Sequence, residues 1–218
     1  MADLRIGLID GNELVRTGRA MVFNSQPDMR VVFEESDPVV AIERAPDYLL
    51  DVLLVGPSQH RLRGEQFIQS LTKALRDAGN YCAVVAYNSF TTPKLRFEAI
   101  KAGAHEFVGL DTAASELLTL VRKVVKRDFI VEPSQLLSLA EEYGALEGSQ
   151  QLELKLAELT DIQTEMVTMF LTGANDLAIS KKLDSARTRV SNLISSLMSS
   201  AGVSTRNQLA LVLAVRPA

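Results

Sequence analysis

A small number of side chains in this sequence could do chemistry, and the first of them is Asp10. Asp10 follows the apolar run of residues 4–9, and a carboxylate at such a place can hold a divalent cation when a second acid stands beside it. The next residue is Gly11, so the second acid is missing. We therefore expect Asp10 to cap the following helix, and a residual metal site at Asp10 stays open as the alternative.

The sequence shows no sign of metal or nucleophilic catalysis. Cys82 is the only cysteine, and His60 and His105 do not supply the spacing of a zinc site. Residues 82–86 are typical of a buried strand, so we interpret Cys82 as a packing residue. Neither a phosphate-binding glycine loop nor a pair of catalytic carboxylates is present. We predict that the chain is not an enzyme and uses no cofactor or metal.

A second set of side chains, near the carboxyl end, suits contact with nucleic acid. A helix is predicted to begin near Ala186 and to bury Val190 and Leu197. Arginine near the start of such a helix can bind phosphate or guanine, and serine and asparagine can bind base edges. The candidate DNA-contacting residues are Lys181, Lys182, Arg187, Thr188, Arg189, Ser191, Asn192 and Ser195.

Three further helices are predicted around this one, over residues 160–172, 176–183 and 206–215. Four short helices with one apolar core and a basic helix start are the arrangement of a helix-turn-helix unit. From residue 150 onward the positive excess is only about one charge, which predicts few phosphate contacts and weak non-specific binding. A four-helix dimerisation unit that does not bind DNA is the alternative.

The last of these helices has more apolar surface than a small domain is expected to bury. We interpret the surplus as a dimer contact, which would also bring two recognition helices to symmetric half-sites. The candidate dimerisation residues are Leu209, Leu211, Val212 and Val215.

The rest of the chain must position or control this unit, and it reads as alternating strands and helices. The predicted strands are residues 4–9, 29–33, 49–55, 82–87 and 106–108. This alternation predicts an α/β doubly wound fold with a five-stranded parallel sheet. Such folds place functional residues at the carboxyl ends of the strands, which here are Asp10, Gly56, Asn88 and Leu110.

The length of 218 residues favours two domains. We expect a first domain over residues 1–127, a helical linker over 128–157, and a small all-α domain over 158–218. The first part carries most of the negative charge. No apolar run is long enough to span a membrane, and the first seven residues lack the pattern of a signal peptide, so we expect a cytoplasmic protein without membrane contact.

The chain resembles a known bacterial family. The order of elements, Asp10, Asn88, the turn at 102–104 and the tract 129–136 resemble the receiver domain of NarL/FixJ-type response regulators. Residues 159–211 are similar to the LuxR-type helix-turn-helix of the same family. The resemblance implies a transcription regulator that binds double-stranded DNA, with Ser191, Asn192 and Ser195 as base-reading positions.

The chain departs from this family where receivers take up phosphate. Receivers use an acid pair with Mg²⁺, an acceptor aspartate, a Thr or Ser, and a Lys. At the matching positions this sequence has Asp10-Gly11, Gly56, Asn88 and Leu110. Because glycine has no side chain to phosphorylate, residue type excludes the usual aspartyl phosphate. We expect Gly56 to leave space in the degenerate pocket and Leu110 to add apolar lining.

Control would then pass to constitutive dimerisation, to a protein partner or to a small ligand in the degenerate pocket. The alternative function is an adaptor that has lost DNA binding and pairs with other regulators. An enzyme is the third hypothesis, because the doubly wound fold hosts many enzymes, but fold alone is weak support for activity.

Overall fold

The computed structural model describes residues 3–57, 64–126, 131–144 and 150–213. The chain divides into two compact units, Met1–Ile130 and Val131–Ala218. The first unit ends close to the expected boundary at residue 127. The expected linker, residues 128–157, spans the boundary between these two units.

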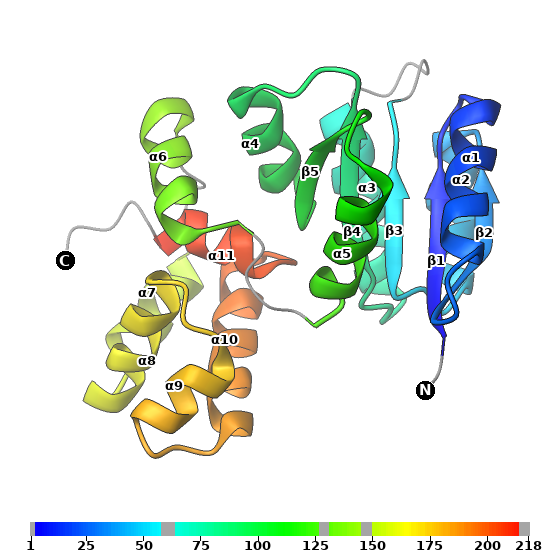
Figure 1. Cartoon of the computed structure of the whole chain (residues 1–218). Helices are drawn as coiled ribbons and strands as arrows, with labels where there is room; N and C mark the ends of the chain where they lie inside the picture. Colours follow the sequence, from blue (N-terminus) through cyan, green and yellow to red (C-terminus); the bar gives the residue numbers. More distant parts are fainter. Residues whose placement is uncertain (1–2, 58–63, 127–130, 145–149, 214–218) are drawn as a thin grey trace. The chain divides into compact units, whose positions relative to one another are not determined.

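The first unit is built on a five-stranded parallel sheet with the strand order β2-β1-β3-β4-β5, drawn in Figure 1. Its strands are β1 (Leu4–Ile9), β2 (Met29–Glu35), β3 (Val52–Val55), β4 (Ala83–Asn88) and β5 (Glu106–Gly109). The predicted doubly wound fold is confirmed. The third strand begins later than residue 49, and Leu49 is exposed.

Helices cover both faces of this sheet (Figure 1). They are α1 (Glu13–Asn24), α2 (Pro38–Arg44), the short 3₁₀ helix η1 (Ala45–Asp47), α3 (Gly64–Asp77), α4 (Pro93–Ala102) and α5 (Ala114–Val124). Two separate apolar clusters show the layering. Leu53 and Val55 of β3 pack with α2, α3 and α4, whereas Val52 and Leu54 pack with α1 and α5. This alternation is the period of two expected for a strand covered on both faces.

The second unit is helical. Its described helices are α6 (Pro133–Tyr143), α7 (Gln150–Ala157), α8 (Asp161–Leu171), α9 (Asp176–Lys182), α10 (Arg187–Ala201) and α11 (Arg206–Leu213). Thr160 and Gln163 form a capping box at the start of α8, and Asn175 caps α9. The four helices α8 to α11 are those expected from the sequence. Their shared core includes Met166, Phe170 and Ile179, which are fully buried.

Two further helices pack on these four. Helix α7 contacts α10, and helix α6 contacts α11. Leu136 of α6 and Leu152 of α7 are fully buried. The carboxyl-terminal unit therefore has more apolar packing surface than a four-helix domain.

The extra packing corrects our interpretation of α11 as a helix with uncovered apolar surface. Leu209, Leu211 and Val212 are buried within the chain, and α6 and α10 are the helices that contact α11. The expectation of an uncovered face was wrong because it counted only four helices. Val215, the fourth candidate dimerisation residue, lies outside the described residues.

Candidate functional site

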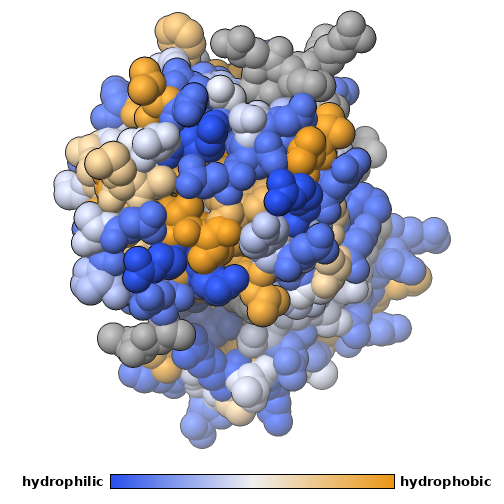
Figure 2. Space-filling model, turned by 90° about the vertical axis from the view of Figure 1, so that its right-hand side faces the viewer, coloured by the Kyte–Doolittle hydropathy of each residue, from blue (hydrophilic) through white to orange (hydrophobic). Residues whose placement is uncertain are grey.

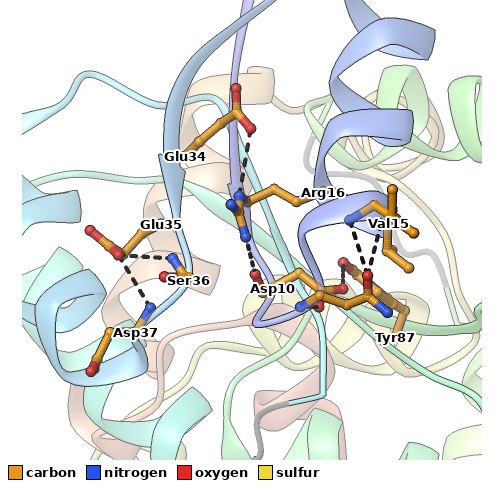
Figure 3. A network of polar contacts seen from close by, with 10 residues as sticks. Asp10, Val15, Arg16, Glu34, Glu35, Ser36, Asp37 and Tyr87 are labelled. Atoms are coloured by element: carbon orange, nitrogen blue, oxygen red, sulfur yellow. Dashed lines mark hydrogen bonds and ion pairs between the residues drawn. The ribbon is translucent and has the colours of Figure 1, made fainter.

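Asp10 lies at the carboxyl end of β1 and is almost completely buried. Its Oδ1 accepts a hydrogen bond from the backbone N–H of Asn12 at 2.7 Å, and its Oδ2 accepts one from the Tyr87 hydroxyl at 2.5 Å (Figure 3). The helix cap of α1 is Asn12, whose side chain accepts from Leu14 and Val15. Our expectation that Asp10 caps the helix was therefore wrong by two residues, and its carboxylate has a different role.

Two further side chains lie near Asp10, one from strand β4 and one from helix α1. Tyr87, on β4, is buried in the cluster beneath α1 and α5. The guanidinium of Arg19, on α1, lies 3.9 Å from the centre of the Tyr87 ring, within the range of a cation–π contact. Arg19 Nη1 is buried and has no hydrogen-bond partner within the described part of the chain.

The electrostatics of this group favour a neutral phenol beside a carboxylate. Burial raises the pKa of Tyr87, and its hydrogen bond to Asp10 raises the pKa further. Burial lowers the pKa of Arg19, while the nearby Tyr87 and Asp10 raise it. Arginine is still a cation in such a setting because its ordinary pKa is so high. Tyr87 therefore remains a hydrogen-bond donor, and Arg19 supplies positive charge near a buried carboxylate.

Gly56 lies directly against this group. A Cβ atom at position 56 would overlap Asp10 Oδ2 and would lie 2.7 Å from the Tyr87 hydroxyl oxygen. Real Cβ atoms do not approach neighbours so closely, so the residue must lack a side chain while Asp10 and Tyr87 keep these positions. Our expectation that Gly56 leaves space was wrong, because Asp10 and Tyr87 already occupy the volume.

A hollow of about 670 Å³ lies next to Asp10. It is lined by Asp10, Gly11, Asn12, Val15, Ser36, Asp37, Pro38, Pro57, Ser89 and Leu110. Leu110 thus contributes apolar lining, as expected. Gly56 and Asn88 are not among the lining residues. The Asn88 side chain accepts a hydrogen bond from the backbone N–H of Ser89, and the cap of α4 is Thr92.

These residues do not fit the Mg²⁺ that the resemblance implies. Gly11 and Gly56 have no carboxylate to offer as a second acidic ligand beside Asp10, and each Asp10 oxygen already accepts one hydrogen bond. Among the described residues no group of three or more His, Cys, Asp or Glu side chains could hold a metal. Cys82 is buried, and burial raises the pKa of its thiol, so it lacks the thiolate needed for reactivity.

Acidic and basic side chains flank this edge of the sheet (Figure 3). Arg16 donates to the backbone oxygen of Asp10 at 2.6 Å and lies 3.7 Å from the Glu34 carboxylate. Glu35 accepts from the backbone N–H groups of Ser36 and Asp37. These bonds join the start of α1 and the start of α2 to the ends of β1 and β2.

The first unit also exposes apolar side chains on α1. Leu14 and Met21 are 85% and 70% exposed, and residues seven apart lie on one face of a helix. Figure 2 views the molecule from the side that carries α1, α2 and β2, and hydrophobic side chains gather in the middle of that face among hydrophilic ones. Exposed apolar side chains of this kind suit contact with another protein.

The second candidate site is the outer face of α10. Val190 and Leu197 are buried, as predicted, and Leu193 and Ile194 are buried with them, which fixes the face of α10 that points outward. Of the candidate residues, Ser191 is half-buried, and the others are exposed, namely Lys181, Lys182, Arg187, Thr188, Arg189, Asn192 and Ser195. The spacing of Thr188, Asn192 and Ser195 places them on one side of the helix.

A tight turn sets α10 against α9. Asp184 adopts a left-handed conformation with φ of 46°, which aspartate tolerates better than most residues. The Ser185 N–H donates to the Ser180 oxygen at 3.0 Å, and this bond closes the end of α9. Ala186 at the start of α10 makes no side-chain cap. The N-cap residue of α10 thus supplies no side-chain acceptor, and the Arg189 N–H donates to the Ala186 backbone oxygen at 2.9 Å.

An ion pair that we did not predict links α9 to α11. The two terminal guanidinium nitrogens of Arg206, Nη1 and Nη2, donate to the two Asp176 carboxylate oxygens at 2.7 and 2.8 Å. Both side chains are largely buried. The sequence placed Asp176 only at a helix start, and nothing in its spacing marked Arg206 as a partner. Leu177, the next residue after Asp176, is 46% exposed.

The chain is similar to bacterial transcriptional regulators along nearly its whole length. No family model matches it. It is 25% identical over 208 residues to the transcriptional regulatory protein LiaR of Bacillus subtilis, with 95% of each chain covered. It is 24% identical to the DNA-binding transcriptional activator DevR/DosR of Mycobacterium tuberculosis, with 95% of this chain and 93% of that protein covered.

Solved structures show the same fold. The receiver domain of NarL from Mycobacterium tuberculosis matches 58% of this chain and 98% of its own, with a TM-score of 0.52 and 23% identity. The RcsB response regulator of Salmonella typhimurium matches 99% of this chain and all of its own, with a TM-score of 0.53 and 18% identity. The chain is thus similar over nearly its whole length to bacterial transcriptional regulators, and its fold is that of solved response regulators. Within the described residues, no helix is both long and apolar enough to cross a membrane.

Proposed function

We propose that this protein is a sequence-specific, DNA-binding transcription regulator. The observation that carries the proposal is the outer face of α10, where Arg187, Asn192 and Ser195 are exposed above a buried apolar stripe. A short helix α9 and a tight turn precede α10, as in helix-turn-helix units that insert their second helix into the major groove. Similarity to the DNA-binding transcriptional activator DevR/DosR supports the same function.

The receiver-like unit, in this proposal, is not phosphorylated at the usual position. Gly56 offers no acceptor atom, and a side chain there would overlap Asp10. Control passes to dimerisation, to a protein partner or to a small ligand in the hollow beside Asp10. The exposed Leu14 and Met21 on α1 suit a protein contact, and the buried state of Leu209 and Leu211 makes α1 a more accessible surface than α11.

DNA binding can be tested by selecting genomic fragments with the purified protein and measuring affinity for a selected fragment. We expect Asn192→Ala to cost about 1–3 kcal/mol of discrimination between specific and altered sites. We expect Arg187→Ala to weaken binding and to lower the salt dependence by about one phosphate contact. Lys123→Ala, which removes an exposed charge from α5, is the control and should bind as the wild type does.

The absence of phosphoryl transfer has its own test. Incubation with acetyl phosphate and Mg²⁺ should leave the mass, the oligomeric state and the DNA affinity of the protein unchanged. A phosphate adduct that alters DNA binding would contradict this part of the proposal without touching DNA binding itself.

The second candidate function is an adaptor that pairs with other regulators. The small positive excess of the carboxyl-terminal region and the exposed apolar face of α1 favour it. An adaptor would retain no genomic fragment even at low salt, would be indifferent to Arg187→Ala and Asn192→Ala, and would lose its partner when Leu14 and Met21 are replaced by serine.

A further inference from the structure

Asp10 is a buried carboxylate. It lies at the position where the receiver domains that this chain resembles use an acid pair with Mg²⁺. A buried carboxylate is costly unless hydrogen-bond donors or a positive charge compensate it. Here the donors are the Asn12 N–H and the Tyr87 hydroxyl, and a cation close by is the Arg19 guanidinium above the Tyr87 ring. The compensation is thus supplied by the chain itself.

We propose that Asp10, Tyr87 and Arg19 form an internal lock that takes the place of a bound divalent cation at the carboxyl edge of the sheet. Tyr87 donates to one oxygen of Asp10, and Arg19 adds its positive charge to that of Arg16, which donates to the Asp10 backbone oxygen. The lock lies against Gly56 and fixes the positions of Asp10 and Tyr87 at the carboxyl edge of the sheet without metal. It concerns the receiver-like unit alone and does not depend on DNA binding.

The geometry around Gly56 is the second support for the lock. Asp10, Gly56 and Tyr87 come from β1, the end of β3 and β4, which are neighbours in the sheet. A side chain at position 56 would overlap both Asp10 Oδ2 and the Tyr87 hydroxyl. The Asp10–Tyr87 hydrogen bond in this geometry therefore requires a residue without a side chain at position 56.

The lock predicts that restoring the missing second acid is not enough to create a metal site. A Cβ at position 11 would have only one neighbour within 4 Å, the Ser36 oxygen at 3.9 Å, so Gly11→Asp can be made without a clash. The introduced carboxylate would then stand beside Asp10 as a second acid. Because Asp10 is still held by Tyr87 and Arg19, the single variant should bind divalent cations poorly.

The experiment compares two variants that share this second acid. One is Gly11→Asp alone, and the other adds Tyr87→Phe and Arg19→Gln, which remove the hydroxyl and the charge while keeping most of the bulk. Mn²⁺ binding is measured from the electron paramagnetic resonance of the free ion. We expect the triple variant to bind Mn²⁺ at least about tenfold more tightly, and we expect this gain to vanish when Asp10→Asn is added.

Equal Mn²⁺ affinity in the two variants would overturn the lock. A matched triple variant with Gly11→Asn controls for general loosening and should not bind. A second measurement decides the matter if the triple variant does not fold. Gly56→Ala should lower the urea midpoint more in the wild type than in Tyr87→Phe, because without the hydroxyl the Asp10 carboxylate can rotate away. Equal decreases in both backgrounds would show that Gly56 and Tyr87 are not coupled.

Discussion

Tyr87 shows how one side chain changes the chemistry open to another. Asp10 has the residue type and the position of a metal ligand, yet the Tyr87 hydroxyl binds one of its oxygens and the Asn12 N–H binds the other. The Asp10 carboxylate and this hydroxyl together leave no room for a side chain at position 56. At the scale of the residue, the hydrogen bonds that the Asp10 carboxylate already makes affect what else it can bind. The residue type alone does not reveal these bonds.

The state of Tyr87 predicts a loss of stability at alkaline pH. Its pKa is raised in the folded protein, mainly by burial, from an ordinary value of 10.0. The phenol therefore ionises more readily in the unfolded chain, so its contribution to stability is complete below about pH 10 and falls as pH rises above it. Burial also raises the pKa of the Cys82 thiol from its ordinary value of 9.0, so this group acts in the same direction.

We expect the free energy of unfolding of the first unit to fall above about pH 9, by up to about 1.4 kcal/mol per pH unit for each fully shifted group. Urea denaturation at about pH 8 and about pH 10.5 measures the slope. Tyr87→Phe should make the slope shallower, and Tyr81→Phe, at an exposed tyrosine, should not. A slope that is the same in all three proteins would contradict the prediction.

At the scale of elements, the described part of the carboxyl-terminal unit is stabilised by the Asp176–Arg206 ion pair and by two additional helices, α6 and α7. Asp176 at the start of α9 and Arg206 at the start of α11 make a bidentate, largely buried bond. Helix α6 contacts α11 as well, and Leu136, Leu139 and Ala140 of α6 are buried. Both contacts orient the helices that flank α10, so both should affect DNA binding without touching DNA.

Breaking the Asp176–Arg206 pair should destabilise the second unit strongly. Removal of one partner leaves the other charge buried and unpaired, and we expect Asp176→Ala to cost about 3–5 kcal/mol of unfolding free energy. Far-UV circular dichroism during urea denaturation measures this. The control is Asp77→Ala, which breaks the exposed Lys73–Asp77 pair and should leave the midpoint unchanged. Similar effects of the two substitutions would show that burial of the pair does not matter.

Helix α6 should contribute to the core of the second unit. Leu136 is only 1% exposed, so Leu136→Ala leaves a cavity and should cost about 2–5 kcal/mol of unfolding free energy. Leu154→Ala, on the exposed side of α7, makes the same chemical change and should have little effect. If Leu136→Ala proved neutral, α6 would not be a structural part of this unit.

At the scale of the whole molecule, the chain comprises two compact units, one built on a sheet and one helical. Compact units of one chain can unfold in separate steps. The proposed lock belongs to the first unit and the proposed DNA-contacting face to the second. A regulator assembled in this way can change its control surface without changing its recognition helix.

Substitutions in the two cores should therefore affect different unfolding transitions. Leu71→Ala, at a fully buried position of α3, should lower the transition of the first unit by the loss of about 2–5 kcal/mol. Leu136→Ala should lower that of the second unit. Differential scanning calorimetry resolves the two, and a single transition that both substitutions shift together would contradict independent unfolding.

Much of the fold could be predicted from the sequence because its signals are local. The alternation of apolar runs and helical stripes identified the five parallel strands, and the spacing of Val190, Leu193 and Leu197 identified the buried side of α10. The absence of an acid at position 56 could also be read directly. These features depend on residues within one or two turns of each other.

Only the tertiary structure decided which distant side chains meet. Asp10, Gly56 and Tyr87 are brought together by strand order, since β3 lies between β1 and β4. The pairing of Asp176 with Arg206 and the covering of α11 by α6 likewise join segments far apart in the chain. Local periodicity carries no record of such contacts, because the apolar pattern constrains which face is buried and not what lies against it.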